Sequence, residues 1–147
     1  MAVGKKGWFD VAFLIALLAA CCFWLAMYLF TRPAIDWTWP LRLPAAFLYP
    51  ALIYPVLEEI VFRGWLQDIA RKRLTGPGIG PLSRANLVTS VVFTGLHFIN
   101  HPPAWAAAVF IPSLTFGYFK DRTGGLAAPI GLHVFYNAGY FWIFTGS

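Results

Sequence analysis

The stretch WFDVAFLIALLAACCFWLAMYLF, from Trp8 to Phe30, decides the class of fold. It carries one charge, Asp10, and about 20 such residues at about 1.5 Å rise per residue cross a hydrocarbon core of roughly 30 Å. The stretch predicts a retained anchor helix over residues 8–30. A cleaved signal peptide is the alternative, because Lys5 and Lys6 precede the apolar run. The run exceeds the usual length of a signal core and lacks a small-residue cleavage site, which favours the anchor.

The composition of the chain also indicates a membrane protein. Of its 147 residues, 59% are apolar and 12% charged, which leaves too few polar side chains to solvate a globule of this size. The net charge of +5 comes from short basic clusters between apolar segments, so it does not indicate nucleic-acid binding. We expect a single integral membrane domain over residues 1–147, with the lipid bilayer as its surroundings and no nucleic-acid partner.

Further apolar segments follow the anchor. The second predicted helix runs from Leu43 to Ala70, and Pro55 within it predicts a kink because proline cannot donate to the carbonyl of Ala51. Prolines, glycines and basic residues, including the Lys120–Arg122 segment, mark the loops. The last three helices are expected at Ala85–Asn100, Pro103–Phe119 and Leu126–Phe144. The fold class is therefore an all-α, polytopic membrane helix bundle of about five transmembrane helices, with a motif core at residues 43–145.

Basic residues predict the orientation of this bundle. Cytoplasmic loops carry an excess of lysine and arginine, and an odd number of spans alternates the loops between two sides. Placing the N-terminus inside collects most of the loop cations on the cytoplasmic side and leaves only Arg32 and Arg42 outside. The cations collected are Lys5, Lys6, Arg71, Lys72, Arg73, Arg84, Lys120 and Arg122. We expect a cytoplasmic N-terminus, an outer C-terminus and a bacterial inner membrane.

Five ionisable residues remain inside the predicted spans: Glu58, Glu59, Arg63, His97 and His133. An ionised group near the bilayer centre costs at least about 2.5–3.5 kcal/mol on insertion scales, so these groups should face one another or a wet cavity. Such residues in a membrane span are candidates for a functional site. Because three separate helices supply them, we interpret the set as an intramembrane hydrolytic site.

The spacing within the set suggests roles. Glu59 and Arg63 are four residues apart on one helical face and can form an ion pair, whereas Glu58 lies about 100° around the helix. His133 and Asn137 are also four residues apart. We expect one glutamate to be structural and the other to do chemistry.

Other interpretations of these residues stay open at this stage. Glu59 with Arg63 can be a purely structural ion pair, and a single histidine can be a hydrogen-bonded packing residue. Zinc bound by Glu58, His97 and His133 is chemically possible, although no HExxH spacing is present. We predict no metal and no cofactor. A transporter or proton relay is a further alternative, disfavoured because no inverted repeat is visible.

Three ordered motifs carry a resemblance to a known family. Glu58-Glu59-Ile60-Val61-Phe62-Arg63 fits EExxxR, Phe93-Thr94-Gly95-Leu96-His97 fits FxxxH, and His133-Val134-Phe135-Tyr136-Asn137 fits HxxxN. The chain resembles the CAAX protease and bacteriocin-processing (CPBP) family, also called type II CAAX endopeptidases, of intramembrane glutamic endopeptidases. Its small size and the segment His101-Pro102-Pro103 resemble a small bacterial branch linked to JDVT-CTERM sorting signals.

The resemblance implies a function and a role for each motif residue. It implies that Glu58 and His97 activate a water, that His133 and Asn137 stabilise the oxyanion, and that Glu59 and Arg63 order the site. The substrate would be a membrane-anchored or membrane-proximal protein or peptide, such as a C-terminal sorting signal. The alternative is a non-catalytic immunity or scaffolding protein of the same fold. The sequence does not indicate an oligomeric state.

Overall fold

The computed structural model describes residues 10–146, which form helices and, within that range, no extended strand. This confirms the all-α class. Helix α1 spans Val11–Thr31; the side chain of Asp10 caps it by accepting from the Phe13 amide at 3.1 Å, and it ends at Arg32 in the left-handed region. Trp8, with which the predicted anchor begins, and the basic pair Lys5 and Lys6 lie outside the described residues.

A second long helix runs continuously from Pro44 to Arg73. It passes through five stretches of slightly different helical geometry: α3 (Pro44–Leu48), the π-helical η1 (Tyr49–Ile53), α4 (Tyr54–Glu59), the π-helical η2 (Ile60–Leu66) and α5 (Gln67–Arg73). A short helix, α2 (Trp39–Arg42), precedes it. The helix continues through Pro55, and the π-helical turn η1 lies just before this proline. The predicted kink stays a prediction.

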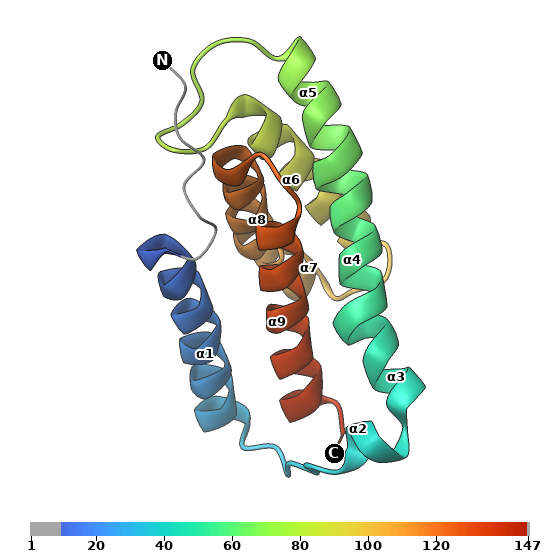
Figure 1. The fold of residues 1–147 in the computed structure, drawn as a ribbon. Helices are drawn as coiled ribbons and strands as arrows, with labels where there is room; N and C mark the ends of the chain where they lie inside the picture. Colours follow the sequence, from blue (N-terminus) through green and yellow to red (C-terminus); the bar gives the residue numbers. More distant parts are fainter. Residues whose placement is uncertain (1–9, 147) are drawn as a thin grey trace. The chain divides into compact units, whose positions relative to one another are not determined.

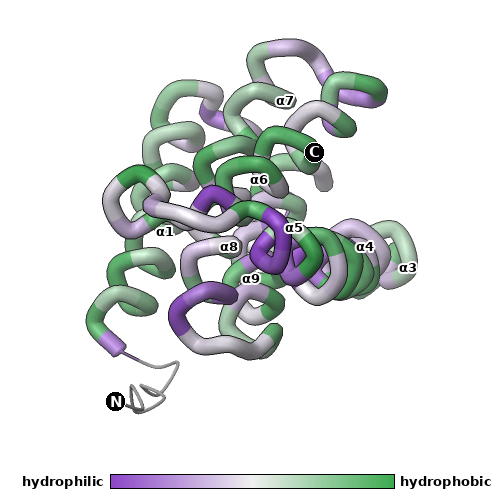
Figure 2. The backbone as a smooth tube through the Cα atoms, turned by 90° about the horizontal axis from the view of Figure 1, so that it is seen from above, coloured by the Kyte–Doolittle hydropathy of each residue, from purple (hydrophilic) through white to green (hydrophobic). Residues whose placement is uncertain are grey.

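Two helices in the described range, Val11–Thr31 and Pro44–Arg73, are long and apolar enough to cross a membrane. Only 17% of the most apolar stretch of each is buried, so neither resembles the core helix of a water-soluble protein. Figure 2 shows α1 as hydrophobic over nearly its whole length, whereas the end of α5 is hydrophilic. The total of about five spans stays a prediction.

The third and fourth predicted helices differ from their predicted bounds. Helix α6 spans Arg84–His97, so the predicted helix ends in a turn before Asn100. The predicted fourth helix is broken at Val109 into α7 (Pro103–Ala108) and α8 (Phe110–Thr123). Pro112 explains the break, because it has no N–H for the carbonyl of Ala108.

The prediction of a loop at Lys120–Arg122 was wrong, because these residues form the last turn of α8. The helix ends only at Gly124, whose φ of 70° is the left-handed conformation that glycine adopts without steric cost. Helix α9 spans Ala127–Phe144 and agrees with its predicted bounds to within one residue.

The described residues divide into two compact units. The first contains residues 58–130, in which α6 packs on both α5 and α8 (Figure 1). The second contains residues 10–57 and 131–146. In the second unit the hydroxyl of Tyr136 donates to the carbonyl of Ala16 at 2.7 Å, which fastens α9 to α1. The single membrane domain stays a prediction.

Candidate active site

An ion pair lies buried in the first unit. Nε of Arg63 is 3.3 Å from Oε2 of Glu59, and both side chains are fully buried. The pair confirms the contact predicted from the spacing of four residues. Nη2 of Arg63 also donates to the carbonyl and hydroxyl oxygens of Ser113, at 2.9 and 2.8 Å. The guanidinium carbon lies 4.8 Å from the ring centroid of Phe93 and 5.7 Å from that of Phe116. The arginine is therefore fixed by an anion, by hydrogen bonds and by two aromatic faces.

The contact between Arg63 and Ser113 is the first of three contacts that join the long helix to α8. Nε2 of Gln67 donates to the carbonyl of Gly117 at 3.0 Å, and Arg71 forms an ion pair with Asp121. Each of the three contacts joins residues that are 50 positions apart in the sequence. A constant offset means that α8 runs parallel to the long helix and in register with it.

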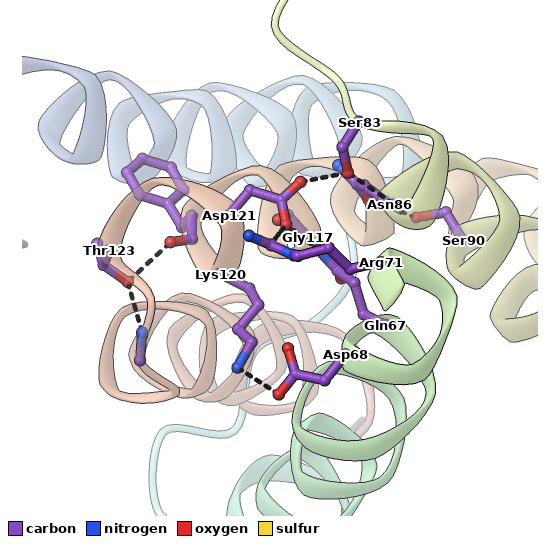
Figure 3. Close-up of polar contacts among 12 residues, drawn as sticks. Gln67, Asp68, Arg71, Ser83, Asn86, Ser90, Gly117, Lys120, Asp121 and Thr123 are labelled. Atoms are coloured by element: carbon purple, nitrogen blue, oxygen red, sulfur yellow. Dashed lines mark hydrogen bonds and ion pairs between the residues drawn. The ribbon is translucent and has the colours of Figure 1, made fainter. Parts of the chain in front are cut away.

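The third of these contacts belongs to a polar cluster, which Figure 3 shows around Asp121. The carboxylate of Asp121 accepts hydrogen bonds from Gln67, from Arg71 and from the hydroxyl of Ser83. It thus joins the ends of α5 and α8 to the start of α6. Nearby, Nζ of Lys120 is 3.1 Å from Oδ2 of Asp68. Arg71 and Lys120 at this end therefore form ion pairs, although sequence reasoning treated them only as topology signals.

Helix α6 is held against α8 by Asn86. Its Nδ2 donates to the carbonyl of Leu114 at 2.9 Å, and its Oδ1 accepts from the hydroxyl of Ser90 at 3.1 Å. Gly117 is the reason that this buried carboxamide fits, because a Cβ there would overlap it. Sequence reasoning missed Asn86 and Gly117. It also missed Gln67, which the repeated spacing of four from Glu59 to Arg71 could have indicated.

Glu58 and Glu59 differ in environment, as their positions around the helix predicted. Glu59 is fully buried beside Arg63, whereas Glu58 is partly exposed. Of the two glutamates, Glu58 is therefore the one that is accessible from outside the packed helices. The expectation that one glutamate is structural and the other does chemistry stays a prediction.

The packing of two phenylalanines relates Glu58 to His97. Phe62 and Phe93 meet edge to face with ring centroids 4.9 Å apart. Helix α6 returns along the long helix in the opposite direction (Figure 1). Glu58 precedes Phe62 by four residues and His97 follows Phe93 by four, so one turn beyond the phenylalanine pair the register brings Glu58 and His97 to the same level.

His97 is held in a defined ring orientation at the end of α6. Its Nδ1 lies 2.9 Å from the carbonyl oxygen of Phe93, and the two rings pack with centroids 4.5 Å apart. A carbonyl oxygen can only accept, so Nδ1 of His97 carries a proton. In the neutral ring Nε2 then presents its lone pair, which is the form a general base requires. Gly95 leaves space on this helix, since no described atom lies within 4 Å of a Cβ added there.

His101, which the sequence places in a loop after α6, stacks on His97. The ring centroids are 5.6 Å apart and the ring planes differ by 19°. His101 is exposed, whereas His97 is partly buried. The loop therefore places a second imidazole over the predicted catalytic one, a contact that the three motifs do not contain.

His133 and Asn137 belong to the second unit and lie one turn apart on α9. His133 is buried, with 5% of its surface exposed. Nδ2 of Asn137 donates to the carbonyl of Pro50 at 3.0 Å, which fastens α9 to the π-helical turn η1. Across residues 10–146, no group of three or more histidine, cysteine, aspartate or glutamate side chains is arranged to hold a metal ion.

The helices, the apolar exterior and the buried charges define a class: a helical membrane protein that keeps acidic, basic and histidine side chains inside its apolar segments. A family model described as type II CAAX prenyl endopeptidase Rce1-like matches residues 38–139. The chain belongs to this family of membrane endopeptidases, and the resemblance carried by the three motifs is confirmed. No curated protein and no solved structure was found to match the chain.

Proposed function

We propose that the chain is an intramembrane endopeptidase of the glutamic type, which hydrolyses a peptide bond in a membrane-anchored or membrane-proximal protein. The observation that carries the proposal is the packing of Phe62 on Phe93. From this contact and the helix register we infer that the partly exposed Glu58 and His97 lie at the same level. Membership in a family of endopeptidases supports the reaction class. Because Glu59 is fully buried against Arg63, we assign it a structural role and assign the reaction to Glu58.

Water activation is the first step of the proposed mechanism. Glu58 and His97 bind a water between them, and the lone pair on Nε2 of His97 or the carboxylate of Glu58 takes one of its protons. The hydrogen bond from Nδ1 of His97 to the carbonyl of Phe93 keeps Nε2 available for this purpose. The resulting hydroxide attacks the carbonyl carbon of the substrate.

The remaining steps need hydrogen-bond donors for the oxyanion and a proton for the leaving amine. The tetrahedral intermediate carries a negative oxygen, for which we propose His133 and Asn137 as hydrogen-bond donors. The proton taken from water then passes to the leaving amine, and the C–N bond breaks to give a carboxylic acid and an amine. Glu59 and Arg63 take no part in proton transfer. They hold the helix that carries Glu58 against Ser113 on α8.

The substrate class follows in part from the family. The description of the family names CAAX prenyl endopeptidases. For this chain we propose a membrane-anchored peptide, with a C-terminal sorting signal as the more specific candidate. A partly exposed carboxylate within an apolar helix suits a peptide bond that lies close to the bilayer.

The test compares purified protein in detergent with two variants of the proposed machinery. Glu58→Gln removes the carboxylate charge with almost no change in size, and His97→Ala removes the imidazole. We expect both to abolish cleavage of anchored candidate peptides while folding is preserved. Asp36→Asn is the matched control, because it makes the same carboxylate-to-amide change in an exposed loop where Asp36 pairs with Arg42.

Product identity is read by terminal sequencing of peptides released from one membrane extract by active and Glu58→Gln protein. Undiminished cleavage by both variants would overturn the glutamic mechanism. Stoichiometric zinc in the active protein, with activity lost to a chelator and restored by metal, would favour the metal alternative. A cellular phenotype that survives Glu58→Gln would favour the non-catalytic scaffold.

A further inference from the structure

We propose that Pro55 is a positioning residue for Asn137: because proline lacks an N–H, it leaves the carbonyl of Pro50 free to orient the Asn137 side chain. The catalytic part of this inference rests on the proposed function, in which Asn137 donates to the oxyanion. The structural part stands on contacts within the second unit alone. It assigns a role to a proline outside the three family motifs.

The backbone around η1 shows why the Pro50 carbonyl is available. In an α-helix this carbonyl would accept from the amide of Tyr54, but the Tyr54 amide donates instead to the carbonyl of Tyr49. In a π-helix it would accept from residue 55, which is a proline without an N–H. Neither regular helix pattern therefore supplies a donor to the Pro50 carbonyl.

The side chain of Asn137 provides the missing donor. Its Nδ2 lies 3.0 Å from the carbonyl oxygen of Pro50, a normal hydrogen-bond distance. A carboxamide nitrogen has two N–H groups in one plane, so fixing one of them fixes the direction of the other. Asn137 thus has one N–H committed to the helix backbone and a second whose direction the first determines.

This arrangement matters for the proposed reaction. His133 is one turn before Asn137 on α9, so the bond to Pro50 also holds the segment that carries the histidine. Oxyanion donors act only when they are oriented before the charge develops. A displacement of about 1 Å in such a group can reduce turnover by about a hundredfold.

The Pro55→Ala variant tests the inference directly, because it restores an N–H at this position. If that N–H donates to the carbonyl of Pro50, it competes with Asn137 for the same oxygen. If it donates to the carbonyl of Ala51, the segment returns to the α pattern, in which the Tyr54 amide reaches the Pro50 carbonyl. In either case we expect the helix to remain intact or to become more stable, and Asn137 to lose its fixed direction.

Pro44→Ala is the matched control for this substitution. Pro44 is at the start of the helix, where its missing N–H has no helix partner. The same exchange of proline for alanine there restores an N–H without changing the acceptor available to Asn137. We therefore expect the hydrogen bond from Asn137 to Pro50 to persist in this variant.

The first readout is thermal unfolding in detergent, arranged as a double-mutant cycle. Asn137→Ala should lower the unfolding midpoint clearly when Pro55 is present and much less in the Pro55→Ala background. An equal effect of Asn137→Ala in both backgrounds would overturn the inference, whether or not any activity has been found. If Pro55→Ala fails to fold, Asn137→Asp takes its place: it retains the size but exchanges the donor for an acceptor, and should be less stable than Asn137→Ala.

The second readout is steady-state kinetics with a cleaved peptide. Pro55→Ala should lower kcat about tenfold or more at unchanged KM, and adding Asn137→Ala should cause little further loss. Pro44→Ala should keep the parent kcat. Full kcat in Pro55→Ala, with Asn137→Ala impaired, would show that Asn137 acts without help from Pro55. Failure of Glu58→Gln to affect turnover would instead refute the proposed function and leave the stability cycle valid.

Discussion

Arg63 and Ser113 are joined by two hydrogen bonds from a single nitrogen. Nη2 of Arg63 donates to both the carbonyl and the hydroxyl oxygen of Ser113, at 2.9 and 2.8 Å. The same guanidinium group pairs with Glu59, and all three side chains are fully buried. A buried guanidinium needs both its counter-ion and its hydrogen bonds, because each unsatisfied interaction carries a desolvation cost.

The first prediction ranks two variants of this cluster. Glu59→Gln removes the ion-pair partner of the buried arginine, which should reduce the free energy of unfolding by about 3–5 kcal/mol. Ser113→Ala removes one neutral partner and leaves the backbone carbonyl in place, so its cost should be about 1–3 kcal/mol. Denaturation in mixed micelles measures both. A Glu59→Gln protein at least as stable as Ser113→Ala would mean that the ion pair contributes little to stability.

Local features of the fold and site could be predicted from the sequence. The apolar run of α1 and the spacing of Glu59 and Arg63 determine structure within a single helix, where geometry follows from residue number alone. The three motifs were sufficient to identify the family. Pro112 was also visible, and the break that it causes before α8 was missed only because the apolar pattern runs through it.

Contacts between helices could not be predicted in the same way. The residues Glu59, Arg63, Gln67 and Arg71 form a visible row, but nothing in that row identifies its partner helix or the offset of 50 residues. That register depends on the shapes of both helices and on the turns between them. In the same way, Pro55 predicts a free carbonyl but does not predict which side chain will bind it.

The second prediction concerns the stacked imidazoles. His101 covers one face of His97, and an aromatic pair of this kind contributes about 0.5–1.5 kcal/mol beyond its buried area. If the stack holds the proposed catalytic ring of His97 in place, His101→Ala should lower kcat about two- to tenfold. His101→Phe should restore most of the loss, because it keeps an aromatic face without a titratable nitrogen. A failure of phenylalanine to restore activity would indicate that the imidazole itself exchanges protons.

The third prediction tests the orientation of the long helix. Ile79 and Trp37 are exposed and flank the Pro44–Arg73 segment in sequence. In a protein whose own Cys21 and Cys22 are replaced by serine, a membrane-impermeant maleimide should label Ile79→Cys only from the cytoplasmic side. It should label Trp37→Cys only from the outer side.

Each alternative labelling pattern has a distinct meaning. The reverse pattern would invert the predicted topology while keeping the span. Labelling of both positions from the same side would show that Pro44–Arg73 does not cross the membrane. The replacement of the native thiols is necessary because both are free and exposed on α1.

The fourth prediction uses two glycines of α9 that differ only in what faces them. A Cβ at Gly139 would overlap the indole ring of Trp24 on α1, whereas no described atom lies within 4 Å of a Cβ at Gly131. Gly139→Ala should therefore separate the two helices and cost about 1–3 kcal/mol of unfolding free energy. Gly131→Ala should gain roughly 0.5–1 kcal/mol, because alanine loses less conformational freedom than glycine in a helix.

The pair of variants separates packing from helix propensity. Both substitutions improve the propensity of α9 equally, so the difference between their unfolding free energies measures the contact with Trp24 alone. Trp24→Ala in combination with Gly139→Ala provides the control, since the added methyl group then meets no indole ring. If Gly139→Ala is as stable as Gly131→Ala, then α1 does not pack tightly on α9, and the hydrogen bond from Tyr136 to the carbonyl of Ala16 must be the main link between them.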